Sequence, residues 1–186
     1  MIKSTAYLQN IDMLELALHI LDIAQNSISA GATTVSLVIR ESIADNALVI
    51  TIEDNGKGIP SELLPSIKDP FVTTRTTRSV GMGLSLFESA AVTCGGKLNV
   101  ESSEGKGTKV TAEFIHNHID RMPLGNMAET MVTLISGQPD IDFIYRHVTD
   151  DKEFELSTFE LRNILGEVPL NSPDVLVWIR EYINEG

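Results

Sequence analysis

The stretch ALVITIEDNGKGIP, residues 47–60, decides the fold, because a strand runs directly into a glycine-rich turn there. Residues 47–53 alternate in character and are rich in β-branched side chains, which is typical of a half-buried strand. The stretch TVSLVIR, residues 34–40, has the same pattern. Asp45 and Asn46 supply a turn between these two segments, so we expect them to form a pair of strands.

Helix patterns stand on both sides of this pair. Residues 13–29 contain no Pro or Gly and are mostly apolar, which predicts a long and largely buried helix that ends at Gly31. Ser61 is a candidate cap for a short helix through Ile67. The segment 69–83 has little apolar periodicity and predicts a mobile loop. The next predicted elements are a helix at 83–96 closed by Gly95 and Gly96, a strand at 97–102 and a strand at 107–114.

This order of elements predicts an α+β fold. We expect a two-layer α/β sandwich, in which helices cover one face of a mixed sheet. The covered face is expected to carry residues such as Ile50, Val100 and Val110, or their alternates along each strand.

The pattern restarts near residue 117, so we divide the chain into a main domain, 1–116, and a C-terminal extension, 117–186. The extension predicts an αββαα order: a helix at 124–135, strands at 142–148 and 152–156, and two helices. Ser172 and Pro173 are typical of the start of the last helix, for which Trp178 and Tyr182 would supply apolar surface. A unit of about 70 residues is marginal alone, so we expect it to pack on the main domain or on a partner.

Composition and charge exclude several classes of protein. The chain has 186 residues, 42% of them apolar, which is enough for a real core. Its net charge of −12 repels nucleic acid and anionic membranes, so neither is an expected partner. The single cysteine, Cys94, predicts a packing residue in a reducing compartment. Without a leader pattern or a membrane-spanning apolar run, the chain is expected to be cytoplasmic.

Polar residues recur along the first predicted helix. Their spacing of 4, 3 and 4 places them on one stripe of a mostly apolar helix: Glu15, His19, Asp22 and Asn26. The stripe is either a solvated face or part of a site. In the second interpretation the amide oxygen of Asn26 ligates a divalent ion, and Asp22, one turn away, orients a water or accepts a proton. We expect His19 to be an ordinary hydrogen-bonded residue.

The turn after the 47–53 strand has two interpretations as well. Asn-Gly is among the commonest turn dipeptides, so the segment 53–60 is in the simpler view a turn before a helix. In the functional view Asp54 accepts a hydrogen bond from the exocyclic amine of adenine. Gly56 and Gly58 then let the backbone approach the base.

Two further glycine motifs follow. Residues 81–84, Gly-Met-Gly-Leu, open a helix whose free amides attract phosphate. The preceding loop concentrates positive charge in an otherwise acidic chain, through Lys68, Arg75 and Arg78. Residues 104–108 are in the simpler view a hairpin turn, although the Thr108 hydroxyl could reach a base through water.

Taken in order, these four motifs resemble the nucleotide-binding boxes of the GHKL superfamily of gyrase, the ninety-kilodalton heat-shock chaperone, histidine kinases and MutL. The resemblance covers roughly residues 12–115 and implies a Bergerat-type fold that binds ATP and Mg²⁺. It implies Asn26 as the magnesium ligand and Asp54 as the adenine-reading residue. It implies that the remaining nucleotide-binding residues are Gly56, Gly58, Thr73, Thr74, Arg75, Gly81, Met82, Gly83, Leu84 and Thr108.

The helix with Asn26 is most similar to the MutL version, in which a glutamate four residues earlier is the general base. Asp22 holds that place here, one methylene shorter, and is the expected catalytic residue. The phosphoacceptor hairpin of histidine kinases and the transducer domain of gyrase have no counterpart in these 186 residues. We therefore expect a stand-alone histidine-kinase-like module.

Two functions fit these residues. The first is a signal-transduction kinase or ATPase that phosphorylates a separate protein or hydrolyses ATP in a regulatory role. The alternative is a non-catalytic ATP/ADP-sensing module that binds a partner, like an anti-sigma factor or a regulator associated with redox or hydrogenase genes. A fold that has lost nucleotide binding is the third possibility. The sequence leaves the oligomeric state open.

Overall fold

A computed structural model describes residues 15–67 and 82–186 of the chain. Its elements in chain order are α1 (Leu16–Ser29), β1 (Thr34–Ser42), β2 (Ala47–Asp54), the 3₁₀ turn η1 (Leu64–Ser66), α2 (Met82–Thr93), β3 (Lys97–Ser103), β4 (Gly107–Ile115), α3 (Met127–Gly137), β5 (Asp142–Val148), β6 (Glu153–Ser157), α4 (Thr158–Leu165) and α5 (Pro173–Glu185). The predicted α+β class is confirmed.

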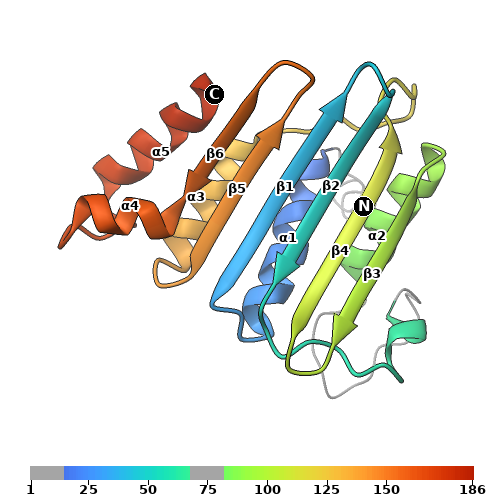
Figure 1. The fold of residues 1–186 in the computed structure, drawn as a ribbon, viewed down its shortest axis with the longest axis horizontal. Helices are drawn as coiled ribbons and strands as arrows, with labels where there is room; N and C mark the ends of the chain where they lie inside the picture. Colours follow the sequence, from blue (N-terminus) through green and yellow to red (C-terminus); the bar gives the residue numbers. More distant parts are fainter. Residues whose placement is uncertain (1–14, 68–81) are drawn as a thin grey trace, which may run out of the picture.

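The strands form one six-stranded mixed sheet with the order β3-β4-β2-β1-β5-β6 (Figure 1). β1 pairs with β2, β2 with β4 and β3 with β4, all antiparallel. The extension adds β5, which lies parallel to β1, and β6, which is antiparallel to β5. The extension therefore packs on the rest of the chain by continuing its sheet, and its status as a separate domain stays a prediction.

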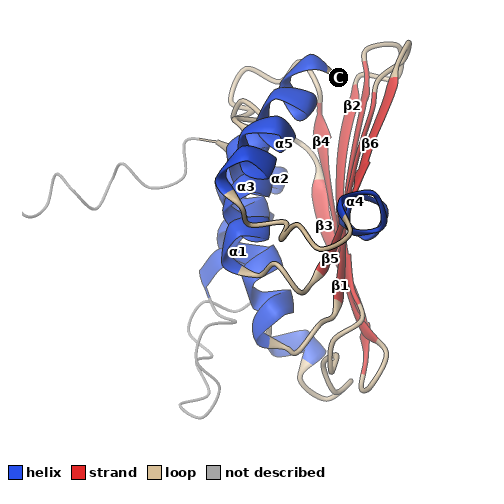
Figure 2. Cartoon of the chain, turned by 90° about the vertical axis from the view of Figure 1, so that its left-hand side faces the viewer, coloured by secondary structure: helices blue, strands red, loops and turns tan. Residues whose placement is uncertain are grey.

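The helices α1, α2, α3 and α5 cover one face of this sheet, and among the described residues no such layer of helices covers the other face, which we call the open face (Figure 2). Alternate residues of β1 and β2 are buried, as the period of a strand requires. The prediction for the covered face is confirmed, because Ile50 and Val110 are buried and Val100 packs against the core. Cys94 is buried at the end of α2, as expected for a packing residue.

The structure corrects three details. The predicted helix over 61–67 is only the 3₁₀ turn η1, and Pro65 lies at its start. Ser172 is the N-cap residue of α5 by position, but its buried hydroxyl has no hydrogen-bond partner among the described residues. Trp178 and Tyr182 remain substantially exposed, and the packing surface of α5 is supplied by Val175 and Ile179.

Among the described residues, no helix combines the length and the apolar character that crossing a bilayer requires.

Candidate functional site

Three segments meet at one end of the sheet, the lower end in Figure 1: the last turns of α1, the loop after β2, and the β3–β4 turn. Asp54, the last residue of β2, is buried there. Its Oδ2 accepts a hydrogen bond from the Ser27 hydroxyl at 2.6 Å, and its Oδ1 accepts one from the Gly56 amide at 2.9 Å. Both oxygens of this carboxylate are therefore fixed in direction, and each retains a second lone pair for another donor.

The glycine loop after Asp54 is bonded to its neighbours on two sides. The Lys57 amide donates to the Ala30 carbonyl at 3.0 Å, and the Lys57 carbonyl accepts from the Gly105 amide at 2.7 Å. Gly58 has a φ of +67°, and a Cβ at this position would overlap the Ser103 carbonyl. Only glycine fits here, because both the left-handed backbone and the close approach exclude a side chain.

Three polar residues that the sequence analysis did not single out hold this end together. Ser27 orients Asp54, as described above. The Asn55 side chain accepts from the amides of Thr33 and Thr34, each at 2.9 Å, and so ties the loop to the start of β1. Ser102 joins the glycine loop to the β3–β4 hairpin. Small polar residues beside glycine motifs were the only signal in the sequence, and they are equally common in ordinary turns.

The Ser102 hydroxyl links the glycine loop to the β3–β4 hairpin. It accepts from the Ile59 amide at 2.8 Å, donates to the Gly107 carbonyl at 2.8 Å, and lies 2.9 Å from the Thr108 hydroxyl. Thr108 is also the register partner of Asp54 across β2 and β4. The predicted hairpin is confirmed, and its threonine lies beside the adenine-reading candidate in the sheet.

The seam between α1 and α2 brings together the other two motifs. Asp22 points at the first turn of α2, where a Cβ on Gly83 would overlap its Oδ2. Burial raises the pKa of the Asp22 carboxyl above its ordinary value. The free amides at a helix N-terminus attract anions, so a phosphate at this point would lie close to Asp22.

Asn26 follows Asp22 by one helical turn on α1 and is half-buried. A side-chain amide oxygen is a ligand type that Mg²⁺ accepts, and Mg²⁺ commonly takes one or two protein ligands together with phosphate oxygens and water. The residues present therefore fit a nucleotide-bound magnesium ion. No cluster of three His, Cys, Asp or Glu residues suited to a metal occurs within 15–67 and 82–186.

His19 differs from the expectation of a hydrogen-bonded residue. Its side chain is 2% exposed and stacks on the Phe87 ring of α2, with centroids 5.2 Å apart. Neither ring nitrogen has a hydrogen-bond partner in the described structure. Burial lowers the pKa of His19 to about 4, so the ring is neutral at pH 7. His19 and Asp22 thus face the α2 helix, and for these two residues the interpretation as a solvated face is wrong.

Several predicted residues fall outside the described part of the chain. They are the loop residues Lys68, Thr73, Thr74, Arg75 and Arg78, and Gly81 at the start of the second glycine motif. Within the described part, the structure brings Asp54, Gly56, Gly58 and Thr108 together, and places Asp22 and Asn26 on the neighbouring helix. The nucleotide roles of these residues remain predictions.

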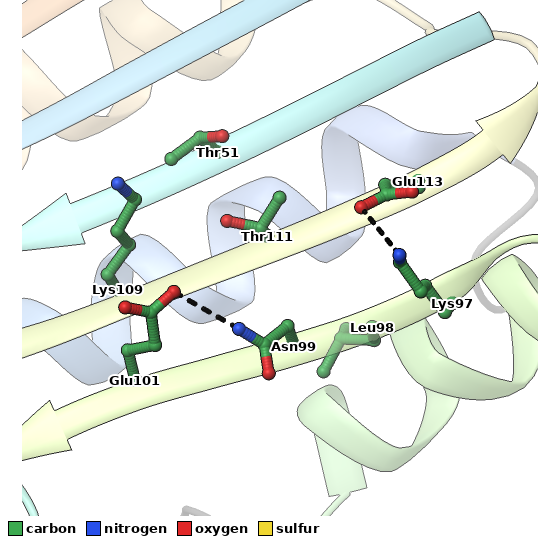
Figure 3. A pocket seen from close by; sticks show the side chains of 8 residues that line it. All are labelled: Thr51, Lys97, Leu98, Asn99, Glu101, Lys109, Thr111 and Glu113. Carbon is green, nitrogen blue, oxygen red and sulfur yellow. Dashed lines mark hydrogen bonds and ion pairs between the residues drawn. The ribbon is translucent and has the colours of Figure 1, made fainter.

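A hollow of about 490 Å³ lies elsewhere, on the open face of the sheet (Figure 3). It is lined by Thr51, Lys97, Leu98, Asn99, Glu101, Lys109, Thr111 and Glu113. Four of its polar side chains pair with each other, Lys97 with Glu113 at 3.4 Å and Asn99 with Glu101 at 3.1 Å. None of the predicted nucleotide-binding residues that the structure describes lines it.

Comparison with known proteins agrees with the family resemblance of the four sequence motifs. The family model described as "Histidine kinase-, DNA gyrase B-, and HSP90-like ATPase" matches residues 11–118. The chain is 31% identical over 97 residues to a "Putative sensor protein" of Shewanella frigidimarina, and 34% identical over 92 residues to "Sporulation kinase D" of Bacillus subtilis. It is 37% identical over 78 residues to "Sensor histidine kinase ZraS" of Salmonella typhimurium.

These matches cover 51%, 50% and 42% of this chain, but only 15%, 18% and 16% of the three relatives. Among solved structures, the crystal structure of the N-terminal domain of a DNA repair protein has a TM-score of 0.51 and 17% identity. That match covers 78% of this chain and 53% of the other, and it shows a likeness of fold. Because the family model spans more than half of its residues, this chain belongs to the histidine kinase-, DNA gyrase B- and HSP90-like ATPase family, whose domain binds ATP.

Proposed function

We propose that this protein binds Mg-ATP at the lower end of the sheet and passes the γ-phosphate to a partner protein or to water. The observation that carries this proposal is the position of Asp22, which lies on α1 one turn before Asn26 and points at Gly83 at the start of α2. A carboxylate between a magnesium-ligand candidate and a phosphate-binding helix end is suited to receive a proton.

In this proposal Asp54 selects adenine. Its two oxygens already accept from Ser27 and Gly56, and the remaining lone pairs accept from the exocyclic amine of the base. Gly56 and Gly58 of the bonded loop carry no side chain, so the backbone at these two positions contacts the flat base closely. This part of the site explains nucleotide choice and contributes nothing to phosphate chemistry.

Asp22 carries the chemistry. The attacking oxygen or nitrogen forms a bond to the γ-phosphorus, the bond from that phosphorus to the β–γ bridging oxygen breaks, and the proton of the attacking group goes to Asp22. The raised pKa of this carboxyl makes it a better base than an exposed aspartate. Asn26 would hold the magnesium ion, which neutralises charge on the phosphates when it is bound.

The test compares two variants, Asp22→Asn and Asp140→Asn, and measures ATP binding separately from release or transfer of the γ-phosphate. Asp22→Asn should bind ATP with an affinity within about threefold of the parent, and should lose about 100-fold or more in γ-phosphate release or transfer. Asp140→Asn, an exposed carboxyl near β5, is the matched control and should behave like the parent. The assays are calorimetric titration with ATP and γ-labelled ATP turnover with and without candidate partners. Unchanged turnover in Asp22→Asn would refute the catalytic role.

The second candidate function is an ATP/ADP-sensing module that binds a partner without chemistry. The observation in its favour is the extension, which continues the sheet through β5 and presents exposed Trp178 and Tyr182. A parent protein that binds ATP but releases no phosphate, and whose affinity for a partner differs between ATP and ADP, would favour this function. If the partner affinity of the Asp22→Asn variant differs between ATP and ADP as much as that of the unmutated protein, this function would be supported further.

A further inference from the structure

A strip of exposed aromatic and apolar side chains lies on the extension. Trp178 and Tyr182 are one turn apart on α5 and stack, with ring centroids 4.9 Å apart and planes 11° from parallel. The Tyr182 ring also contacts the Phe154 ring of β6 at 5.0 Å. The exposed fractions are 46% for Trp178 and 39% for Tyr182, and Val177 is similarly exposed. We call the half-buried Phe154 and the exposed Trp178 and Tyr182 the aromatic strip.

The fold uses Phe154 of this strip in its own packing, because that ring is partly buried against the core and contacts Tyr145, but it leaves Trp178 and Tyr182 substantially exposed. The inward side of α5 is formed by Val175 and Ile179, which are buried against the core. β6 is the edge strand of the sheet, so the strip lies at one side of the molecule. Large exposed aromatic side chains that already hold one another in place lose little conformational freedom on binding, which is a property of anchor residues at interfaces.

Charge indicates what kind of partner fits the strip. Residues 117–186 contain thirteen Asp and Glu against five Lys and Arg, a net charge of −8 out of the −12 of the whole chain. Four of the five bases are already engaged. Arg121 donates to the backbone of His116 and Met122, Arg146 pairs with Glu153, Arg162 with Asp142, and Arg180 with Glu129.

Acidic side chains also flank the strip on α5 itself. Asp174 lies four residues before Trp178, Glu181 lies three after it, and both are exposed. Glu185 lies three residues after Tyr182 and is exposed as well. Cationic side chains are attracted to such a surface by two interactions. The carboxylates attract them by charge, and the aromatic rings attract them by cation–π interaction.

We propose that the aromatic strip is a docking surface for a basic amphipathic segment of a partner protein. Apolar residues of that segment cover Trp178 and Tyr182, and its Lys or Arg side chains meet the carboxylates on either side. The same charge opposes the other occupants, since nucleic acid, an anionic membrane and the same face of a second copy all repel it. The proposal is independent of nucleotide chemistry.

The single tryptophan of the chain is Trp178, so its fluorescence reports on this surface alone. The probes are an amphipathic Lys/Leu peptide and a Glu/Leu peptide of the same length and pattern. The Lys/Leu peptide should shift and saturate the emission, more weakly at higher salt, and the Glu/Leu peptide should not. Tyr182→Ala should weaken binding about tenfold or more, and Tyr182→Phe should retain it.

A charge-reversal pair separates docking from long-range attraction. Glu181→Lys on the strip and Glu101→Lys on β3, the opposite edge of the sheet, change the net charge equally. Only Glu181→Lys should weaken binding by about tenfold. Equal weakening by both variants, equal binding of both peptides, or self-association of the protein that Tyr182→Ala abolishes would each overturn the proposal. Circular dichroism confirms that each variant is folded.

Discussion

The two ends of the sheet each hold a carboxylate between two hydrogen-bond donors, but the donors differ in kind. At the lower end in Figure 1, Asp54 accepts from the Ser27 hydroxyl and the Gly56 amide. At the upper end, Glu41 of β1 accepts from His116 at 3.1 Å and from His147 at 2.8 Å. The first pair of donors is a hydroxyl and a backbone amide, whereas the second pair is the imidazole rings of His116 and His147.

The surroundings of the two carboxylates differ as well. Asp54 joins the end of α1 to the glycine loop after β2, while Glu41 joins three segments of the fold. His116 directly follows β4, and His147 belongs to β5 of the extension and also lies 3.3 Å from the Tyr145 hydroxyl. A carboxylate held by two donors thus ties a helix and a glycine loop to the sheet at one end, and joins β1, β5 and the end of β4 at the other.

The largest expected effect is that of Asp54→Asn on nucleotide affinity. Asparagine has one acceptor oxygen, so it cannot accept from Ser27, Gly56 and adenine as a carboxylate does. We expect ATP affinity to fall about 100-fold, or about 3 kcal/mol, by calorimetry. Glu53→Gln, one residue earlier on the exposed face of β2, is the matched control. An ATP affinity of Asp54→Asn equal to the parent would contradict the adenine assignment.

Glu41→Gln is the corresponding change at the other end, and it should reduce stability without affecting ATP binding. We expect a loss of about 2 kcal/mol in the free energy of unfolding at pH 7, measured with urea. The hydrogen bond from His147 is the main cause that lowers the pKa of Glu41 from 4.5; burial opposes it, and His116 adds to it.

A carboxyl with a lowered pKa contributes stability above its ordinary pKa, and that contribution is lost as pH falls through the folded value. The difference between Glu41→Gln and the parent should therefore shrink below pH 4.5. Glu113→Gln, whose carboxylate pairs with Lys97 on the open face, should cost much less. A loss of ATP affinity in Glu41→Gln would show that the two ends are not independent.

His19 lies between the two ends, and its ring nitrogens have no partner in the described structure. His19→Leu removes two unpaired polar atoms and should raise the free energy of unfolding by about 1 kcal/mol at pH 7.5. The unfolded state binds a proton below pH 6.5 and the folded state only near pH 4, so the parent loses stability across this interval.

The gain from His19→Leu should consequently grow as pH falls from 7.5 to 5, which urea unfolding at both values would measure. Leu18→Ala, a change at an exposed residue of the same helix that does not titrate, is the control and should show no such trend. A gain that is constant with pH would mean that His19 is not held neutral by burial.

Ser27→Ala is expected to have the smallest effect. It removes one of the two donors that fix Asp54 and leaves the carboxylate able to bind adenine. ATP affinity should fall about fivefold, close to 1 kcal/mol. Ser29→Ala, two residues later on the exposed side of α1, should leave it unchanged. A loss as large as that of Asp54→Asn would mean that Ser27 contacts the nucleotide directly.

The sequence by itself determined the local elements and the family. Strand alternation in 34–40 and 47–53, the glycines that end α1 and α2, and four spaced motifs were sufficient, because each depends on residues close together in the chain. The same patterns predicted the helices and strands of the extension with shifts of a few residues at their ends.

Only the tertiary structure decided which polar groups meet. Ser27 and Asp54 are 27 residues apart, and Glu41 and His147 are 106 apart. Periodicity reports that a side chain faces inward, but it does not report which segment lies opposite. The parallel pairing of β5 with β1 and the burial of His19 against Phe87 therefore appeared only once the sheet and its helices were assembled.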